Sequence, residues 1–228
     1  MNRFYQTQIR LSECDCLNVS HFCFKEGSLI GADCVFNITR PLDCEKWRNK
    51  RKETFLAGRL AVRHAQTYLN EPAKDIPKAE DGSPLWPNEY TGSISHTDNQ
   101  AVAVLLPRSQ GDIQYIGIDL EQLDNADKLD AGDLIGCKEE FEILASAGIE
   151  KAQRALLLFS LKESVYKALY PAVGEYFDFL DVVLVSIEQT DVFVFQVRRT
   201  LSRRIKSGYL VKGRYKILGG HVMTWAYC

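Results

Sequence analysis

The sequence predicts an α/β protein, because two long helical segments alternate with short apolar runs that are typical of strands. The helical segments cover about residues 43–69 and 150–170, and strand-like runs follow each of them. With 228 residues and 46% apolar content, the chain can bury a full core as one large domain or two small ones. We expect a division near the middle, into residues 1–112 and 113–228.

The first part is expected to begin with strands and loops, since residues 1–40 hold short apolar runs with few helix signals. A long helix should then run from Asp43, a good N-cap residue, to about Leu69. The Asn-Glu-Pro sequence at residues 70–72 should break this helix, and the Pro- and Gly-containing residues 72–92 are expected to be loop.

Strands and shorter helices complete the expected elements. Strands are expected at residues 92–95, 101–106, 113–121, 182–187, 192–197 and 209–211. Residues 124–136 form a polar connection, and a helix at residues 138–147 should end at Gly148. The second long helix should run from about Glu150 to Tyr170, where Pro171 would stop it.

Two acidic residues, Asp119 and Glu121, lie two positions apart in an apolar run that is typical of a buried strand. Because successive strand side chains alternate between faces, both carboxylates should share one face, roughly 7 Å apart. Like charges at that distance repel by about 2 kcal/mol at an effective dielectric constant of about 20. A divalent cation would remove this repulsion; the alternative is a pair of strand-end carboxylates that face water.

The second long helix carries Glu163 and Lys167, which share a face because they are four residues apart. Glu163 could supply a third carboxylate, and oxygen ligands in this number suit Mg²⁺, which completes its shell with water and phosphate. Lys167 is a natural partner for a phosphate. The alternative for these two residues is an ordinary ion pair on a helix surface.

The first long helix is rich in cations on one side. Within a sector of about 120°, at 100° per residue, lie Arg48, Arg51, Lys52, Arg59 and Arg63. The second half of this helix is otherwise mostly apolar, so Arg59 and Arg63 should emerge from buried surroundings. A buried guanidinium needs an anionic partner, which could be a carboxylate of the core or a phosphate of a ligand.

Three short sequences occur in a set order: Gly92-Ser-Ile-Ser-His96, Gly117-Ile-Asp-Leu-Glu121 and Phe159-Ser-Leu-Lys-Glu-Ser-Val-Tyr-Lys167. Together they resemble the larger, monomeric 4′-phosphopantetheinyl transferases, which carry a Ser-His step, then Gly-x-Asp-x-Glu, then a Lys-Glu-Ser/Ala-x-x-Lys helix. Three further segments look like the enterobactin synthase component D-like branch, which is associated with siderophore synthetases: residues 50–59, 84–87 and 176–180. The resemblance covers about residues 45 to 185.

The resemblance implies two similar α/β halves related by a pseudo-twofold axis, with the active site in the cleft between them. The first half would hold the coenzyme A-binding helix and loop, and the second half the metal-binding and catalytic motifs. Coenzyme A, as substrate, would be bound by Arg51, Arg59, Arg63, Lys78, Ser95, His96, Lys162 and Lys167. Mg²⁺, or Mn²⁺ in its place, would be held by Asp119, Glu121 and Glu163.

Two roles are possible for His96, a structural one and a contact with the substrate. A lone histidine after a strand is usually structural, but here it follows Ser95 in the family's Ser-His step, whose imidazole contacts the coenzyme A phosphates. Many relatives also carry a charged residue beside the Gly-x-Pro step, where this chain has Ser83.

The expected reaction is attack of a carrier-protein serine on the β-phosphorus of coenzyme A, which leaves phosphopantetheine on the serine and releases 3′,5′-adenosine bisphosphate. The carrier would be an acyl, aryl or peptidyl carrier domain of a nonribosomal peptide, polyketide or fatty acid synthase. His96 and Lys167 would neutralise charge on the phosphates, and Glu163, or a metal-bound water held by Asp119, would take the serine proton. Two rivals stay open: another Mg²⁺-dependent phosphotransferase or pyrophosphate hydrolase, and a coenzyme A-binding relative without turnover.

The remaining features limit partners and compartment. A formal charge of −2 gives no general attraction to nucleic acid or anionic membranes, and no run approaches the length of a membrane span. The first ten residues lack the apolar stretch of a signal peptide, so we expect a cytoplasmic protein. The resemblance to the larger transferases implies a monomer.

Two local clusters have open roles. Seven cysteines are expected to be free thiols, and the group of Cys14, Cys16, His21 and Cys23 lacks the paired Cys-x-x-Cys steps of structural zinc sites. Residues 198–216 carry eight Lys or Arg and no acid. They could form a solvated hairpin or attract acidic carrier domains.

Overall fold

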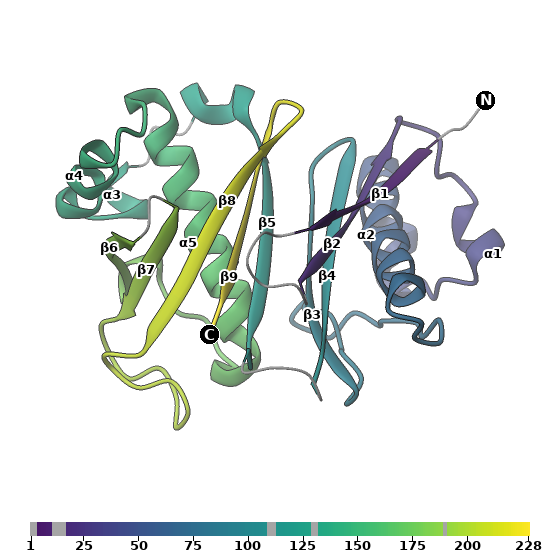
Figure 1. Cartoon of the computed structure of the whole chain (residues 1–228). Coiled ribbons are helices and arrows are strands. Elements are labelled where there is room, and N and C mark those ends of the chain that lie inside the picture. Colours follow the sequence, from purple (N-terminus) through teal and green to yellow (C-terminus); the bar gives the residue numbers. More distant parts are fainter. Residues whose placement is uncertain (1–3, 11–16, 109–112, 129–131, 189–190) are drawn as a thin grey trace. The chain divides into compact units, whose positions relative to one another are not determined.

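The computed structural model of the chain describes residues 4–10, 17–108, 113–128, 132–188 and 191–228 (Figure 1). The chain divides into two compact units, Met1–Gly111 and Asp112–Cys228. Each unit is an antiparallel sheet with a long helix packed against it. The α/β class predicted from the sequence is confirmed, while the pseudo-twofold relation and the cleft between the halves stay predictions.

The first unit has a four-stranded sheet in the order β1-β2-β4-β3. Its strands are β1 (Phe4–Arg10), β2 (Asn18–Phe24), β3 (Tyr90–His96) and β4 (Gln100–Pro107). Helix α2 (Asn49–Tyr68) packs on β2 and β4, with Leu56 and Leu60 of the helix buried in one apolar cluster with Phe22 of the sheet. A short helix α1 (Ala32–Phe36) and a 3₁₀ helix η1 (Leu42–Lys46) precede α2.

Helix α2 begins later than the sequence predicted. Asp43 lies in η1, and α2 starts at Asn49, after Trp47 and Arg48 in extended conformation. The Asp43 carboxylate therefore caps no helix and instead accepts a hydrogen bond from Trp47 Nε1 at 3.0 Å. The end of the helix matches the prediction, because Leu69 is its C-cap residue.

The second unit has a five-stranded sheet in the order β5-β9-β8-β7-β6. Its strands are β5 (Ile116–Gln122), β6 (Val182–Glu188), β7 (Val192–Val197), β8 (Leu210–Leu218) and β9 (His221–Tyr227). Strand β9 was not predicted from the sequence, and β8 is longer than the strand predicted at residues 209–211. The two strands form a hairpin through Gly219 and Gly220, which both adopt positive φ angles, as a tight two-residue turn requires.

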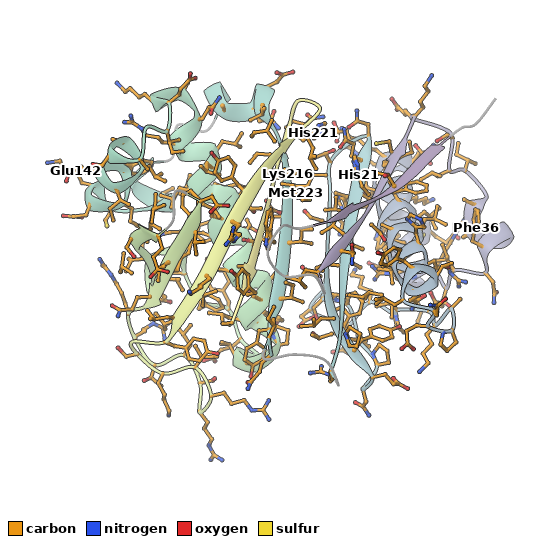
Figure 2. All side chains as sticks on the ribbon, in the orientation of Figure 1. His21, Phe36, Glu142, Lys216, His221 and Met223 are labelled. Carbon is orange, nitrogen blue, oxygen red and sulfur yellow. The ribbon has the colours of Figure 1, made fainter. Side chains whose placement is uncertain are left out.

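Helix α5 (Lys151–Val173) packs on β5, β8 and β9. It continues past Pro171, contrary to the prediction, because a proline in the last turn removes only one backbone donor. The helix ends at Gly174, whose φ of 76° is left-handed and whose N–H donates to the carbonyl of Tyr170 at 2.8 Å. Figure 2 shows side chains on both sheets, such as the buried Met223 of β9.

The region between β5 and α5 holds more structure than the expected polar connection. It contains the 3₁₀ helix η2 (Leu123–Lys128) and helices α3 (Gly132–Ile135) and α4 (Lys138–Ser146). Helix α4 agrees with the predicted helix to within one residue. A further 3₁₀ helix, η3 (Phe179–Asp181), precedes β6.

The cysteines in the described part of the chain are free thiols, as expected: Cys23, Cys34, Cys44, Cys137 and Cys228. Cys14 and Cys16, the other members of the predicted N-terminal group, lie outside the described residues. No helix in the described part of the chain is both long and apolar enough to cross a membrane.

Candidate active site

Residue 117 must be glycine because helix α5 lies directly on the backbone of β5. A Cβ atom at Gly117 would lie 1.9 Å from the carbonyl oxygen of Ser164 and 2.6 Å from the backbone nitrogen of Ala168. The close approach brings Asp119, two residues further along the same strand, within hydrogen-bonding distance of α5. The glycine of the Gly-x-Asp-x-Glu sequence therefore has a packing role that positions the first carboxylate.

Asp119 is buried, with 3% of its surface exposed, and both of its carboxylate oxygens are bonded. Lys167 Nζ donates to Oδ1 at 2.6 Å, and Ser160 Oγ donates to Oδ2 at 2.8 Å. Thr224, which is opposite Asp119 on β9, donates its hydroxyl proton to the carbonyl of Ser160 at 2.8 Å. The hydroxyl oxygens of Ser160 and Thr224 also lie 2.9 Å apart, so Asp119, Ser160 and Thr224 form one hydrogen-bonded group.

The three predicted carboxylates influence one another electrostatically. Burial raises the pKa of Glu121 to about 7, with repulsion from Asp119 and Glu163 adding to the increase and Lys167 opposing it. Burial likewise raises the pKa of Glu163, Lys167 lowers it, and Asp119 raises it further. Lys167 and these three carboxylates, here called the carboxylate cluster, thus interact electrostatically.

This cluster has the donor chemistry for a hard cation. Carboxylate oxygens in a partly desolvated, mutually repelling group are stabilised when a divalent cation binds. Among the described residues, however, no three His, Cys, Asp or Glu side chains are close enough to form a ready-made metal site. Metal binding by Asp119, Glu121 and Glu163 is therefore a proposal that rests on their shared electrostatics.

Lys167 differs from the simple surface partner of Glu163 that one interpretation expected. Its side chain is 27% exposed, and its ammonium group is bonded to the buried Asp119 of the neighbouring strand. Its charge also lowers the pKa of Glu163, one turn earlier in α5. Lys167 therefore belongs to the carboxylate cluster.

Lys162, which the resemblance predicted to bind coenzyme A, makes a buried ion pair in this structure. The residue is 2% exposed, and its Nζ lies 2.8 Å from Glu140 Oε1 and 3.0 Å from the carbonyl of Phe179. Glu140 also accepts hydrogen bonds from the backbone nitrogens of Leu184 and Cys137, each at 2.8 Å. This buried ion pair joins α4, α5 and β6, and coenzyme A binding by Lys162 stays a prediction.

The first unit contains a pocket of about 130 Å³ beside α2. It is lined by Arg51, Thr54, Phe55, Gly58, Arg59, Lys78, Gly82, Pro84, Ile94 and His96. Four of these are residues that the sequence predicted to bind coenzyme A. A Cβ atom at Gly58 would lie 2.9 Å from Ile94 Cγ2, so this glycine lets α2 approach the strand that carries Ser95 and His96.

Arg59 is a buried cation with an unused donor. Its surface is 8% exposed, its guanidinium carbon lies 4.5 Å from the centre of the Phe55 ring, and its Nε has no hydrogen-bond partner in the described structure. Burial lowers the pKa of Arg59 to about 10, with Asp75 partly opposing, so the side chain stays charged at neutral pH. A desolvated cation with an unused donor favours an anionic ligand.

The other predicted contacts of the first unit are less uniform. Arg63 does not line the pocket, and its guanidinium donates to the carbonyl of Asn37 at 2.8 Å. Ser95 is buried next to His96, with 6% of its surface exposed. Arg63 thus has a backbone oxygen as partner instead of the anion that the sequence analysis expected.

Several residues of both sites were missed by sequence reasoning. Ser160 lies in α5, within the sequence Phe159–Lys167, but the spacing of residues in that sequence did not indicate a hydrogen bond to Asp119. Thr224 lies in the strand that was not predicted, and Phe55 looked like ordinary core. An aromatic residue four positions before Arg59 on the same helix face was the available signal for Phe55.

Comparisons with known proteins match most of the chain. The family model of the 4′-phosphopantetheinyl transferase N-terminal domain matches residues 43–106, and that of the 4′-phosphopantetheinyl transferase superfamily matches residues 115–226. These ranges include the pocket of the first unit and the carboxylate cluster of the second.

Curated relatives agree with the family models. The chain is 37% identical to enterobactin synthase component D of Salmonella austin over 126 residues, which is 55% of this chain and 50% of that protein. It is 32% identical to the 4′-phosphopantetheinyl transferase Npt of Nocardia iowensis over 132 residues, 57% of each protein. It is 35% identical to enterobactin synthase component D of Escherichia coli O157:H7 over 147 residues, 64% of this chain and 66% of that protein. The match thus spans 50% to 66% of the length of these relatives.

Proposed function

Because the chain belongs to the 4′-phosphopantetheinyl transferase superfamily, we propose that it transfers 4′-phosphopantetheine from coenzyme A to a serine of an apo carrier protein. The other product is 3′,5′-adenosine bisphosphate. The observation that carries this proposal is the pocket of the first unit, where the buried Arg59 has an unused donor beside Arg51, Lys78 and His96. A phosphate-rich ligand supplies the negative charge that such a pocket needs.

The donor side of the reaction is assigned to the first unit. Arg51, Arg59 and Lys78 would bind phosphates of coenzyme A, and Arg59 would gain the partner that its Nε lacks. His96, at the end of β3, would donate a hydrogen bond to a phosphate oxygen. Fixed cations that hold phosphates in place are a main source of catalysis in such transfers.

The carboxylate cluster is assigned to the acceptor chemistry. Asp119, Glu121 and Glu163 would hold Mg²⁺, which when bound neutralises negative charge on pyrophosphate oxygens. Ser160 and Lys167 hold Asp119 in place. Glu163, whose pKa is raised by burial, would accept the proton of the attacking serine, since a base with a raised pKa is more effective near neutral pH.

The carrier is proposed to belong to a siderophore synthetase. Two of the relatives described above are named as components of an enterobactin synthase. A carrier domain of a nonribosomal peptide synthetase is therefore our first choice, ahead of polyketide and fatty acid synthases.

The test mixes the full chain with coenzyme A, Mg²⁺ and a panel of apo carrier domains, and weighs each carrier by mass spectrometry. We expect one serine to gain a single phosphopantetheine group, fastest on the peptidyl carriers. Hydrolysis of coenzyme A with unchanged carriers would favour a pyrophosphate hydrolase, and binding without turnover would favour a non-catalytic relative.

Two variants test the roles within the site. Glu163→Gln should lower the transfer rate by orders of magnitude and shift the Mg²⁺ dependence to higher concentration. Lys167→Ala should lower kcat with a smaller effect on coenzyme A affinity. Glu188→Gln, at an exposed glutamate of β6, is the matched control and should keep the wild-type rate. Equally mild defects in both site variants would contradict the assignment.

A further inference from the structure

Aromatic and cationic residues alternate from the residues just before α2 into the first half of that helix. Trp47, Arg51, Phe55 and Arg59 follow one another at intervals of four residues. The guanidinium carbon of Arg51 lies 5.4 Å from the centre of the Trp47 ring, and that of Arg59 lies 4.5 Å from the centre of the Phe55 ring. The two rings contact each other edge to face, with centroids 5.5 Å apart.

A third cation joins these residues from the loop after α2. Lys78 Nζ lies 5.0 Å from the centre of the Trp47 ring. Asp43 orients both groups, because its Oδ2 accepts from Trp47 Nε1 at 3.0 Å and from Lys78 Nζ at 3.4 Å. The indole therefore contacts two of the cations that line the pocket, and its own orientation is fixed by a hydrogen bond.

An aromatic partner holds a cation differently from a carboxylate. The ring face attracts the cation and restricts its position, but it does not neutralise the charge or occupy its hydrogen-bond donors in the way an ion pair does. Arg51 and Arg59 therefore stay available to an anionic ligand, and less of their side-chain freedom is lost when the ligand binds. Lys78 also pairs with Asp43, at 3.4 Å.

We propose that Trp47 and Phe55 form an aromatic platform that positions Arg51, Lys78 and Arg59 for the phosphates of the substrate, with Asp43 orienting Trp47. This inference rests on the proposed function and adds positioning residues to it. The indole is partly exposed, and its ring contacts the pocket residues Arg51, Lys78 and Phe55. Its effect should therefore appear in donor affinity and hardly at all in the chemical step.

The test measures the Kd of coenzyme A and of 3′,5′-adenosine bisphosphate by isothermal titration calorimetry on the full chain. Trp47→Leu removes the π face and keeps apolar bulk, so we expect Kd to rise about tenfold for both ligands. Trp47→Phe keeps a ring face but loses the Nε1 donor to Asp43, so it should recover most of the affinity, to within about threefold of wild type. In transfer assays the KM for coenzyme A should follow Kd, with kcat nearly unchanged.

Controls separate the platform from stability and from the proposed function. Trp86→Leu changes the tryptophan that packs on Tyr90 outside the pocket, and it should lower Tm without changing either Kd. Lys78→Ala tests the phosphate pocket itself. If the wild type binds coenzyme A and Lys78→Ala weakens it while Trp47→Leu binds normally, the platform is refuted and the function stands. Equal losses in Trp47→Phe and Trp47→Leu would also refute it, and a wild type that binds neither ligand would overturn the proposed function.

Discussion

Both units pack one long helix on an antiparallel sheet, yet their candidate sites hold opposite charges. The helix of the first unit brings the cation Arg59 into a pocket, and the helix of the second unit lies beside the carboxylates of β5. In the second unit the most deeply buried cation, Lys162, has a carboxylate partner, whereas Arg59 has an unused donor. We infer that, of these two buried cations, the one with a full set of partners serves the fold and the one with an unused donor marks a binding site.

Removing each buried cation should separate these two cases most strongly. Lys162→Met leaves Glu140 buried without its cation and should lower the free energy of unfolding by about 3–5 kcal/mol. Arg59→Met removes a desolvated charge with an unused donor, so in the absence of ligand it should change stability by less than about 1 kcal/mol in either direction. Urea denaturation of the ligand-free protein measures both.

Exposed charge provides the baseline for that experiment. Lys212→Met breaks a surface pair with Glu188 and should cost less than about 0.5 kcal/mol. An Arg59→Met loss as large as that of Lys162→Met would mean that Arg59 is structural, and the contrast between the units would disappear.

The next largest difference in stability is expected between alanine substitutions at Gly117 and at Gly58, the two glycines at which a helix packs closely on a strand. Gly117→Ala places a methyl group against the backbone of α5. That backbone can shift only if the whole helix shifts, so the substitution should lower the free energy of unfolding by about 3 kcal/mol. Gly58→Ala meets only a methyl group of Ile94 and gains helix propensity, so we expect a change within about 1 kcal/mol. Denaturation curves of the two variants decide the matter, and a larger loss at Gly58 would contradict the packing argument.

The pH dependence of stability should have opposite signs at two residues of the two units. Glu121 has a folded pKa of about 7, above its ordinary value, so its contribution is fully present at acidic pH and is lost as pH rises toward 7. Burial lowers the pKa of His64 in α2, so its contribution is present at pH above its ordinary value and is lost as pH falls below it.

Substitution at each site should reveal these signs between pH 5 and 8 in metal-free buffer. Glu121→Gln should make Tm fall less, or rise more, as pH increases. His64→Gln should make Tm fall more, or rise less. Differential scanning calorimetry across this range provides the slopes, and a change of the same sign in both variants would reject the assignment.

The smallest predicted effect concerns the basic segment of residues 198–216. Three of its cations have carboxylate partners: Arg199 with Asp181, Lys212 with Glu188 and Arg214 with Asp191. Arg203 and Arg204 are exposed in the loop before β8. Reversing both to Glu should raise the KM for carrier by about three- to tenfold at low salt and leave the KM for coenzyme A unchanged.

A matched reversal makes that measurement specific. Lys151→Glu changes an exposed cation at the start of α5 and should leave the KM for carrier within about twofold of the wild type. If the double variant behaves like this control, the segment is a solvated loop.

Local pattern allowed the sequence to predict part of the candidate site. Alternation along β5 placed Asp119 and Glu121 on one face, and the apolar surroundings of Arg59 indicated its burial. Long-range pairing explains what was missed. Lys162 was predicted to contact the ligand because its motif resembles a family sequence, and its buried ion pair with Glu140, which lies on another helix, was not predicted.

Strand β9 escaped prediction for a related reason. Its first six residues are all buried, so it shows no alternation of polar and apolar side chains, and Thr224 gave no hint of its place opposite Asp119. The predicted start of α2 was wrong because Asp43 belongs to a residue type that often caps helices. Nothing in the local sequence indicated that its carboxylate accepts a hydrogen bond from Trp47.

The position of β9 between β5 and β8 has a consequence for the order in which the second unit folds. Strand β5 is the first strand of that unit along the chain, but the neighbour that joins it to the other strands is the last. The carboxylate-bearing strand must therefore wait, during synthesis or refolding, until helix α5 and all the other strands of its sheet exist. Pairing across such a long sequence separation is slow because the chain between the strands must first be ordered. The first unit also has a long-range pairing, that of β2 with β4, but it spans a shorter stretch of chain. We therefore expect affinity for phosphates to return earlier in refolding than the pairing of β5 with β9.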